Sequence, residues 1–259
     1  MRWTDEAEAA IKKVPFFVRK KVRARVEKAV DDAGRETVTL AELKAVKARY
    51  LTNMSSQVKG YQLDTCFGPS GCPNRSVVSD TLNKKIEALL KAEDLLSFLK
   101  STVNGELKFH HEFRIAMADC PNACSQVQIK DVGIIGAAMP MITDESCTLC
   151  NACVDQCREA AVLIDEEKEG VEIDYERCLA CGKCIDVCPT GTISLNKKGF
   201  RVQLGGKLGR HPQLAKELPG IYSEDEVVDL VRRCIKFYKD NSRHGKRFAE
   251  IFKMSDILK

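Results

Sequence analysis

The cysteine pattern constrains this chain more than any other feature, because twelve of its thirteen cysteines fall into three groups of four. Two groups are compact runs, Cys147–Cys157 and Cys178–Cys188, and each has the spacing Cys-x2-Cys-x2-Cys-x3-Cys. The third group is split into two distant pairs, Cys66 with Cys72 and Cys120 with Cys124. In a reducing compartment, thiols at such spacings indicate metal ligands and not disulfides. The chain is therefore predicted to fold around metal centres, one of which requires the two distant pairs to meet.

Length and composition describe a globular chain. At 259 residues it is long enough for one large domain or for two to three small ones. Its 44% hydrophobic and 30% charged residues are ordinary for a globular protein, and no run of eighteen apolar residues occurs. The segment Met1–Glu6 turns acidic at once and lacks the apolar stretch of a secretory signal. We therefore expect a cytoplasmic protein without a membrane partner.

The two compact runs resemble those of bacterial ferredoxins that carry two [4Fe–4S] clusters. In that pattern each run gives three thiolates to one cluster, and its last cysteine ligates the other cluster. A pair of structural zinc sites is the weaker alternative, because zinc does not need two identical runs of four cysteines. Residues 141–197 are thus predicted to form an electron-transferring ferredoxin domain. We name its predicted ligands the first thiol set (Cys147, Cys150, Cys153 and Cys188) and the second thiol set (Cys157, Cys178, Cys181 and Cys184).

The formal net charge of +4 changes sign if clusters are present. A [4Fe–4S] core with four thiolates carries about −2, so three clusters would bring the total to about −2. The mildly basic composition therefore gives little reason to expect nucleic acid as a partner, and we predict none. The positive side chains fit the surroundings of the clusters, an acidic cofactor or an acidic protein partner.

Residues 1–55 are predicted to form a module of three helices. Thr4 can cap the first helix, and Pro15 restarts the chain. Valines at helical spacing follow in a second helix that ends near Gly34. A capping box at Thr39 begins the third helix.

This module is similar to the small domain at the C-terminal end of a light-independent protochlorophyllide reductase subunit. The similarity runs from Trp3 through Val14–Arg19 and Glu27 to Thr39. It implies an association with tetrapyrrole or iron–sulfur enzymes and names no reaction.

The rest of the chain is predicted to be a sheet-and-helix domain, residues 60–140 and 198–259, into which the ferredoxin domain is inserted. Turn residues surround Cys66 and Cys72, and one amphipathic helix is expected over 86–99. Strands are predicted at 109–117, 131–136 and 199–206, and a capping box at Ser223 begins a C-terminal helix. The predicted fold class is therefore α+β.

The split cysteine group resembles the cluster motifs of sirohaem-dependent sulfite and nitrite reductases of the dissimilatory and anaerobic types. The resemblance rests on Cys66-x5-Cys72, on Cys120-Pro-Asn-Ala-Cys124, and on residues 132–136 and 204–210. It implies a third [4Fe–4S] cluster, in which Cys124 also ligates the sirohaem iron axially. A plain surface position is the alternative for each side chain that it implies near the sirohaem. The predicted ligands are the third thiol set (Cys66, Cys72, Cys120 and Cys124), and the predicted sirohaem neighbours are Arg75, Asn122, Lys207, Arg210 and His211.

One departure from that family leaves three hypotheses open. The family builds its site from two related halves, whereas only about sixty residues precede Cys66 here. The first hypothesis is a reductase, or a reductase subunit, that passes electrons through three clusters to a sirohaem reducing sulfite or nitrite. It would need an electron-donor protein, and a second subunit or a further copy could complete its site. The second is an iron–sulfur electron-transfer subunit without sirohaem, and the third is a role in tetrapyrrole processing.

The thirteenth cysteine, Cys234, lies four residues after Leu230 in the predicted C-terminal helix. This spacing puts both side chains on the apolar side of the helix. We therefore expect Cys234 to be a buried core residue and not a ligand.

Overall fold

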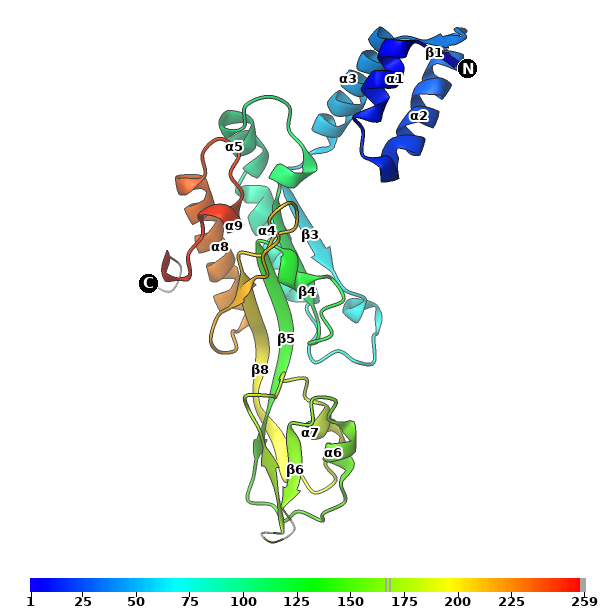
Figure 1. Ribbon diagram of the computed structural model, residues 1–259. Helices are drawn as coiled ribbons and strands as arrows, with labels where there is room; N and C mark the ends of the chain where they lie inside the picture. The colour runs from blue at the N-terminus through cyan, green and yellow to red at the C-terminus, as the bar shows by residue number, and fades with distance from the viewer. Residues whose placement is uncertain (166, 168, 257–259) are drawn as a thin grey trace. The chain divides into compact units, whose positions relative to one another are not determined.

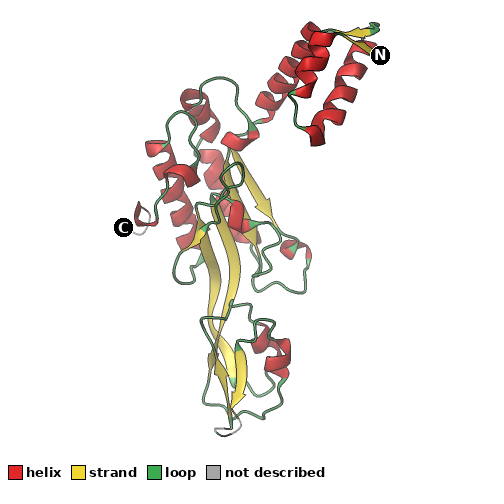
Figure 2. Ribbon diagram, viewed as in Figure 1, coloured by secondary structure: helices red, strands yellow, loops and turns green. Residues whose placement is uncertain are grey.

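The computed structural model describes residues 1–165, 167 and 169–256, and it combines helices with β-sheets (Figure 1, Figure 2). Residues 1–58 and 105–110 form one compact unit. The described residues of 59–104 and 111–259 form the other unit. Among the described residues, no helix combines the length and the apolar character that a membrane crossing needs.

The first unit contains three helices and a short parallel pair of strands. The caps predicted at Thr4 and Thr39 are present, and each side-chain oxygen accepts a backbone N–H of the first helical turn. Ala7, Val26 and Val30 are buried together. The strand pair, which joins the start of the unit to the segment before the third helix, was not predicted. The elements are β1 (Arg2–Trp3), α1 (Asp5–Lys12), α2 (Phe16–Asp31), β2 (Thr37–Val38) and α3 (Leu40–Gln57).

The second unit is organised by a five-stranded sheet with the order β3-β4-β5-β8-β9. Strands β3, β4 and β5 are parallel, whereas β8 is antiparallel to both of its neighbours. The sheet is therefore mixed, and its longest strands, β5 and β8, pair with each other. The strands are β3 (Tyr61–Thr65), β4 (Phe113–Ala118), β5 (Val132–Ile142), β8 (Ile193–Leu204) and β9 (Lys216–Glu217).

Helices α4 and α8 contact each other, and α8 also contacts β8 (Figure 1). A capping box at Ser223 begins α8, as predicted. Phe113 of β4 packs against Tyr238 and Phe248, with ring centroids 5.4 and 5.5 Å apart. These large buried rings hold the C-terminal helices against the sheet. The helices are α4 (Asp80–Ala92), α5 (Leu95–Thr102), α8 (Glu224–Asn241) and α9 (Phe248–Ile251).

The predicted bounds of four elements in this unit were wrong. The single helix expected over 86–99 is two helices, because Asp94 adopts a left-handed conformation (φ 43°) and caps α5 by accepting the Ser97 N–H. The strand expected from residue 109 begins at Phe113, since 109–111 form the 3₁₀ turn η2. Strand β5 continues past the predicted 131–136 to Ile142, and β8 begins at Ile193, before the predicted 199–206, because the two strands hydrogen-bond to each other along most of their length.

Residues 143–192, between β5 and β8, form a small separate segment that we call the insert. Its two ends meet, because Ile142 pairs with Ile193 across the β5–β8 ladder. The insert therefore lies at the far end of a two-stranded ribbon (Figure 2). It contains α6 (Ala152–Gln156), β6 (Val162–Asp165), β7 (Gly170–Ile173) and α7 (Lys183–Val187), and β6 pairs antiparallel with β7.

Candidate metal centres

The first thiol set lines a single cavity inside the insert. Cys147, Cys150 and Cys153 reach it from the first run, and Cys188 reaches it from the second run. Thr190 and Ile193 complete the wall on the side of Cys188. The fold thus brings together the four thiols that the crossed pattern predicts as ligands of one centre.

The second thiol set lines a larger cavity of about 380 Å³. Cys157 joins Cys178, Cys181 and Cys184 there, so this set is also assembled from both runs. The same cavity is lined by Cys120 of the third thiol set. Two of the three thiol sets therefore border one space.

The two runs have the same local backbone. Leu149 and Ala180, each two residues after the first cysteine of its run, are left-handed with φ of 53° and 56°. Their amides donate to the sulfurs of Cys147 and Cys178, in both cases over 3.4 Å. Such conformations cost of order 1–3 kcal/mol at residues other than glycine and persist where the surroundings require them. Here they turn amide donors toward the sulfurs, and such hydrogen bonds are one determinant of a cluster's reduction potential.

The third thiol set is assembled from two loops that follow the neighbouring parallel strands β3 and β4. Cys66 comes directly after β3, and its Sγ accepts the amides of Gly68 and Asp119 at 3.2 and 3.3 Å. The thiols of Cys66, Cys72 and Cys124 lie close enough to Cys120 to act on it electrostatically. The register of β3 with β4, in which Thr65 pairs with Met117, brings the two distant pairs together.

Asp119 holds the segment after Cys72 against the turn that carries Cys120. Its carbonyl accepts the amides of Ser76 and Val77 at 2.8 and 3.2 Å, and its carboxylate accepts the hydroxyl of Ser79 at 2.5 Å. The side chain is buried, and burial raises the pKa of the Asp119 carboxyl. Sequence reasoning missed this residue, for which the only signal is its position before Cys120.

Burial disfavours the ionised form of several of these thiols. Burial raises the pKa of Cys184 to about 12, and it also raises the pKa values of Cys120, Cys153 and Cys178. Such thiols stay protonated unless a bound cation stabilises the thiolates.

The run of the second thiol set is tied to the sheet on several sides. The Ser76 hydroxyl donates to the carbonyl of Cys181 at 2.9 Å, and the Lys183 ammonium donates to the carbonyl of Pro73 at 3.0 Å. The Ala138 amide of β5 donates to the carbonyl of Ala180 at 2.7 Å. These bonds hold the Cys178–Cys184 segment beside both β5 and the segment that follows Cys72.

The residues that the resemblance places near a sirohaem lie mostly on the surface. Cys124, Arg75 and Asn122 are exposed, and Asn122 also lines the cavity shared by Cys120 and the second thiol set. Arg210 and His211 are exposed in the loop that follows β8. The Lys207 side chain is only 15% exposed, and its ammonium lies 3.5 Å from the Glu250 carboxylate. Their roles remain predictions.

Cys234 is fully buried in α8, as predicted for a core residue. Burial raises the pKa of its thiol to about 12. It lines neither of the two cavities that hold the first and second thiol sets.

Comparison with protein families gives matches for both parts of the chain. Residues 70–257 match the family described as nitrite and sulphite reductase 4Fe-4S domain. The chain belongs to this family. Residues 3–47 match the family described as proto-chlorophyllide reductase 57 kD subunit. Both resemblances drawn from the sequence are therefore confirmed.

Curated relatives of this nitrite and sulphite reductase family member are longer proteins. It is 36% identical over 128 residues to a coenzyme F420-dependent sulfite reductase of Methanocaldococcus jannaschii, covering 49% of this chain and 20% of that one. It is 29% identical over 203 residues to a subunit of the anaerobic sulfite reductase of Salmonella typhimurium, covering 77% of this chain and 54% of that one. The crystal structure of dissimilatory sulfite reductase I aligns with 83% of this chain and 55% of that chain, at 15% identity and a TM-score of 0.49.

Proposed function

We propose that this chain is an iron–sulfur oxidoreductase of the sulfite-reductase type, or the cluster-carrying subunit of one. In it, electrons pass from the first thiol set to the second and then to the third. The observation that carries this order is the cavity of about 380 Å³, because Cys120 of the third set shares it with all four thiols of the second set. The first set has a separate cavity bordered only by residues of the insert and the first residue of β8.

The bonds between the insert and the rest of the unit support transfer between the second and third sets. Electron transfer slows steeply with distance, so neighbouring clusters must be held at a constant separation. The hydroxyl of Ser76, four residues after Cys72, bonds the Cys181 carbonyl, and Lys183 bonds the carbonyl of Pro73. The second and third sets are therefore connected through short segments of backbone rather than through a flexible linker.

Cys124 suits the role of a bridging ligand because it is the exposed member of a set whose Cys120 is buried. A sirohaem bound there would supply an iron that binds sulfite or nitrite and a tetrapyrrole that accepts electrons. Basic side chains would pair with its carboxylates and with the anionic substrate. The sheet part of the second unit, residues 59–142 and 193–259, has 24 Lys and Arg and 17 Asp and Glu, a formal net charge of +7. Lys207, Arg210 and Arg75 belong to this excess.

The electron path needs a donor at the first thiol set and a partner at the third thiol set. The chain spans about half the length, or less, of the curated relatives named above, and one of these is a subunit by its name. We propose that a second subunit or a further copy of the chain covers Cys124 and completes the substrate site. This partner would shield from water the face on which Arg75 and Asn122 are exposed.

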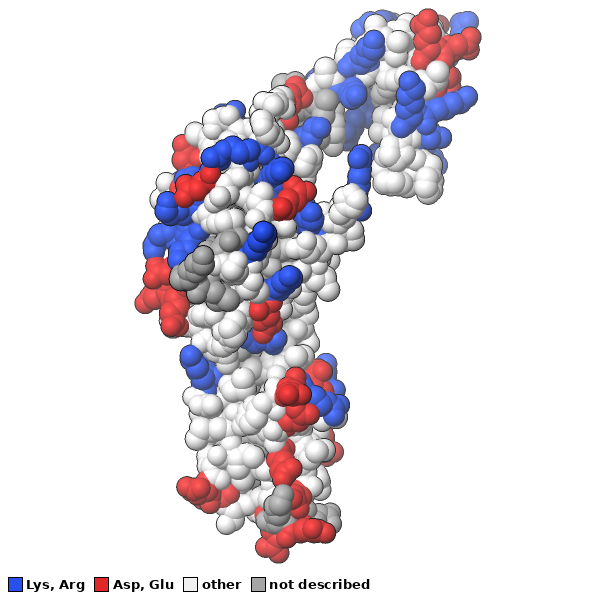
Figure 3. Space-filling view, turned by 60° about the vertical axis from the view of Figure 1, so that its left-hand side comes forward, with Lys and Arg blue, Asp and Glu red and all other residues white. Residues whose placement is uncertain are grey.

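The electron donor should present a basic surface. The insert has 12 Asp and Glu and 4 Lys and Arg, a formal net charge of −8 before any cluster is added. Figure 3 shows mainly acidic side chains over the insert, with a few basic ones among them. Opposite charge steers an encounter and raises its rate. The exposed Cys150 of the first thiol set marks where such a donor would approach.

An electron-transfer subunit without sirohaem is the second candidate. It is favoured by the exposure of Arg75, Asn122, Arg210 and His211, which in this chain alone enclose no buried tetrapyrrole site. In that case the third cluster would pass electrons to a partner enzyme through the same exposed Cys124.

Iron content and visible absorption of the anaerobically reconstituted chain test these proposals. Three clusters require about twelve irons and give a broad spectrum, whereas sirohaem adds one iron and sharp tetrapyrrole bands. If these bands never form when sirohaem and candidate partner subunits are supplied, the reductase proposal fails and the second candidate remains. Cys124→Ser should disturb the third cluster and sirohaem alone. Loss of all three clusters in this variant would contradict the separation of the insert from the third set.

A further inference from the structure

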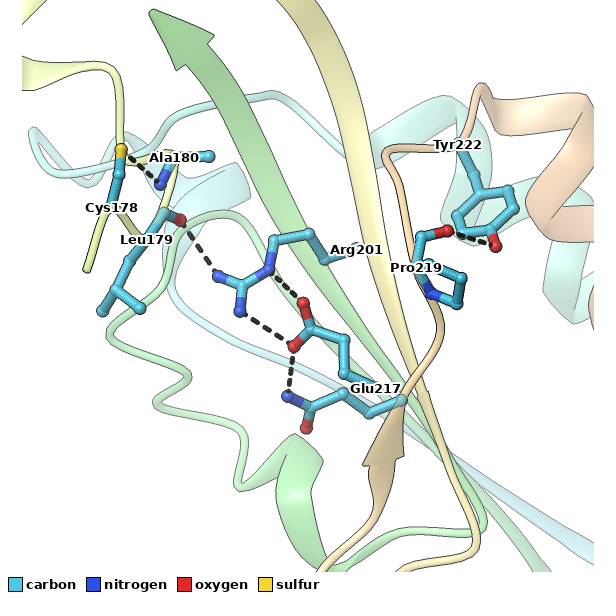
Figure 4. Close-up of polar contacts among 8 residues, drawn as sticks. Cys178, Leu179, Ala180, Arg201, Glu217, Pro219 and Tyr222 are labelled. Carbon is cyan, nitrogen blue, oxygen red and sulfur yellow. Dashed lines mark hydrogen bonds and ion pairs between the residues drawn. The ribbon is translucent and has the colours of Figure 1, made fainter. Parts of the chain in front are cut away.

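Arg201 of β8 makes a set of contacts that the electron path itself does not explain. Its Nη1 donates to the carbonyl of Leu179 at 3.0 Å, within the run of the second thiol set. Its Nε and Nη2 donate to the two carboxylate oxygens of Glu217 at 2.6 and 2.8 Å. Figure 4 shows the guanidinium between the Cys178 segment on one side and Glu217 of β9 on the other. One side chain therefore connects a cysteine run to two strands of the sheet.

The Arg201–Glu217 pair is less exposed, and more constrained in its geometry, than an ordinary surface ion pair. The Arg201 side chain is only 18% exposed, and the pair with Glu217 is bidentate. Gln203, two residues along β8, donates to Glu217 Oε2 at 2.9 Å and holds the carboxylate in place. The planar guanidinium donates hydrogen bonds to a carbonyl and to a carboxylate at the same time. A lysine ammonium cannot do so with the same geometry.

Arg201 is also a cation that reaches this thiol set. Leu179, whose carbonyl accepts the guanidinium, lies between Cys178 and Cys181, so the charge of Arg201 is held beside two thiols of the set. A positive charge near a cluster stabilises the reduced form, which carries one more negative charge. Glu217, held against the guanidinium, opposes part of this effect.

We propose that Arg201 is a positioning residue that sets both the place and the reduction potential of a cluster held by the second thiol set. The proposal rests on the proposed function, since it requires that cluster to be present. Its bond to Leu179 fixes the Cys178–Cys181 loop against β8, and its charge raises the potential of the cluster that must accept electrons from the first set. Glu217 on the edge strand β9 is the counter-charge that limits this rise.

Four variants of the full, reconstituted chain test the proposal by redox titration followed by electron paramagnetic resonance. Arg201→Met removes the charge and the bond to Leu179, whereas Arg201→Lys keeps the charge. Glu217→Gln removes the counter-charge and leaves Arg201 in place. Lys198→Met is the matched control, because Lys198 is exposed on the same strand and its loss changes the net charge equally.

We expect Arg201→Met to lower the midpoint of one insert cluster by about 59 mV or more, a tenfold change in its oxidised-to-reduced ratio at fixed potential for one electron. Glu217→Gln should raise the same midpoint, and Arg201→Lys and Lys198→Met should change the ratio less than threefold. If Arg201→Met fails to assemble that cluster, Glu217→Gln alone decides by the direction of its shift. Midpoints that stay unchanged, or that move in the same direction in Arg201→Met and Glu217→Gln, would overturn the proposal. A wild-type chain without insert clusters would instead refute the proposed function.

Discussion

Replacing Gly136 of β5 by alanine tests whether close backbone packing assembles the third thiol set. A Cβ at this position would lie 2.4 Å from Val77 Cγ2 and 2.5 Å from the carbonyl oxygen of Asp119. Ordinary contacts begin near 3.4 Å, so the overlap is about 1 Å on each side. The Asp119 carbonyl cannot swing away, because it accepts the amides of Ser76 and Val77. Overpacking of this kind costs about 1–3 kcal/mol, which leaves a typical protein folded.

The displaced segments carry Cys120 and follow Cys72, so Gly136→Ala should lose the third cluster selectively. Iron should fall from about twelve to about eight per chain, while both insert clusters keep their paramagnetic signals. Gly220→Ala is the control, because a Cβ added there would meet no atom within 4 Å and only its positive φ of 95° adds strain, of about 1–2 kcal/mol. It should keep all the iron. A Gly136→Ala protein with full iron content and an unchanged urea midpoint would refute the packing argument.

Four further outcomes are expected. Ser223→Ala should lower the unfolding free energy by about 1 kcal/mol, measured in urea, without loss of iron, because it removes only the cap of α8. Cys234→Ala should cost about 1–2 kcal/mol and also retain all iron; loss of iron would make Cys234 a ligand. Burial raises the pKa of Asp131 to about 6 in the folded chain. In the unfolded chain this carboxyl ionises at a lower pH, near 4. The unfolding free energy should therefore fall by about 3 kcal/mol as the pH rises from about 4 to above 6. Urea midpoints should show this slope in the wild type and a flatter one in Asp131→Asn. In stopped-flow reduction of the insert, added salt should slow reduced methyl viologen, a cation, and accelerate dithionite, an anion; a common direction for both would contradict the role given to the acidic surface.

Structural features that depend on nearby residues were predicted correctly from the sequence alone. The capping boxes at Thr39 and Ser223 are present because each involves residues three apart, whose geometry depends little on the rest of the fold. The four thiols predicted for the first set do line one cavity, because the two runs repeat the same backbone turns. The break at Asp94 escaped prediction, since an apolar pattern continues through both helices and does not show a single left-handed residue.

Apart from the meeting of the two distant cysteine pairs, contacts between distant segments could not be predicted. Ser76 and Cys181 are 105 residues apart, and nothing in either neighbourhood indicates that a hydroxyl and a carbonyl will meet. The alternating pattern around Arg201 indicates only that this residue faces away from the core, and the two-residue strand of Glu217 has no such pattern. Their pairing depends on the register of β8 with β9, in which Gln203 is opposite Glu217.

The sequence by itself determined the number and grouping of the thiols and the family to which the chain belongs. Both depend on short motifs, in which the geometry of metal ligation sets the spacing of the cysteines. The tertiary structure alone decided that the second and third thiol sets border one cavity and that the first set lies apart from it. The physical reason is the pairing of β5 with β8, which carries the insert at one end, together with the bonds from Ser76, Lys183 and Arg201 that hold one cysteine run against the sheet. The order of the proposed electron path follows from that arrangement.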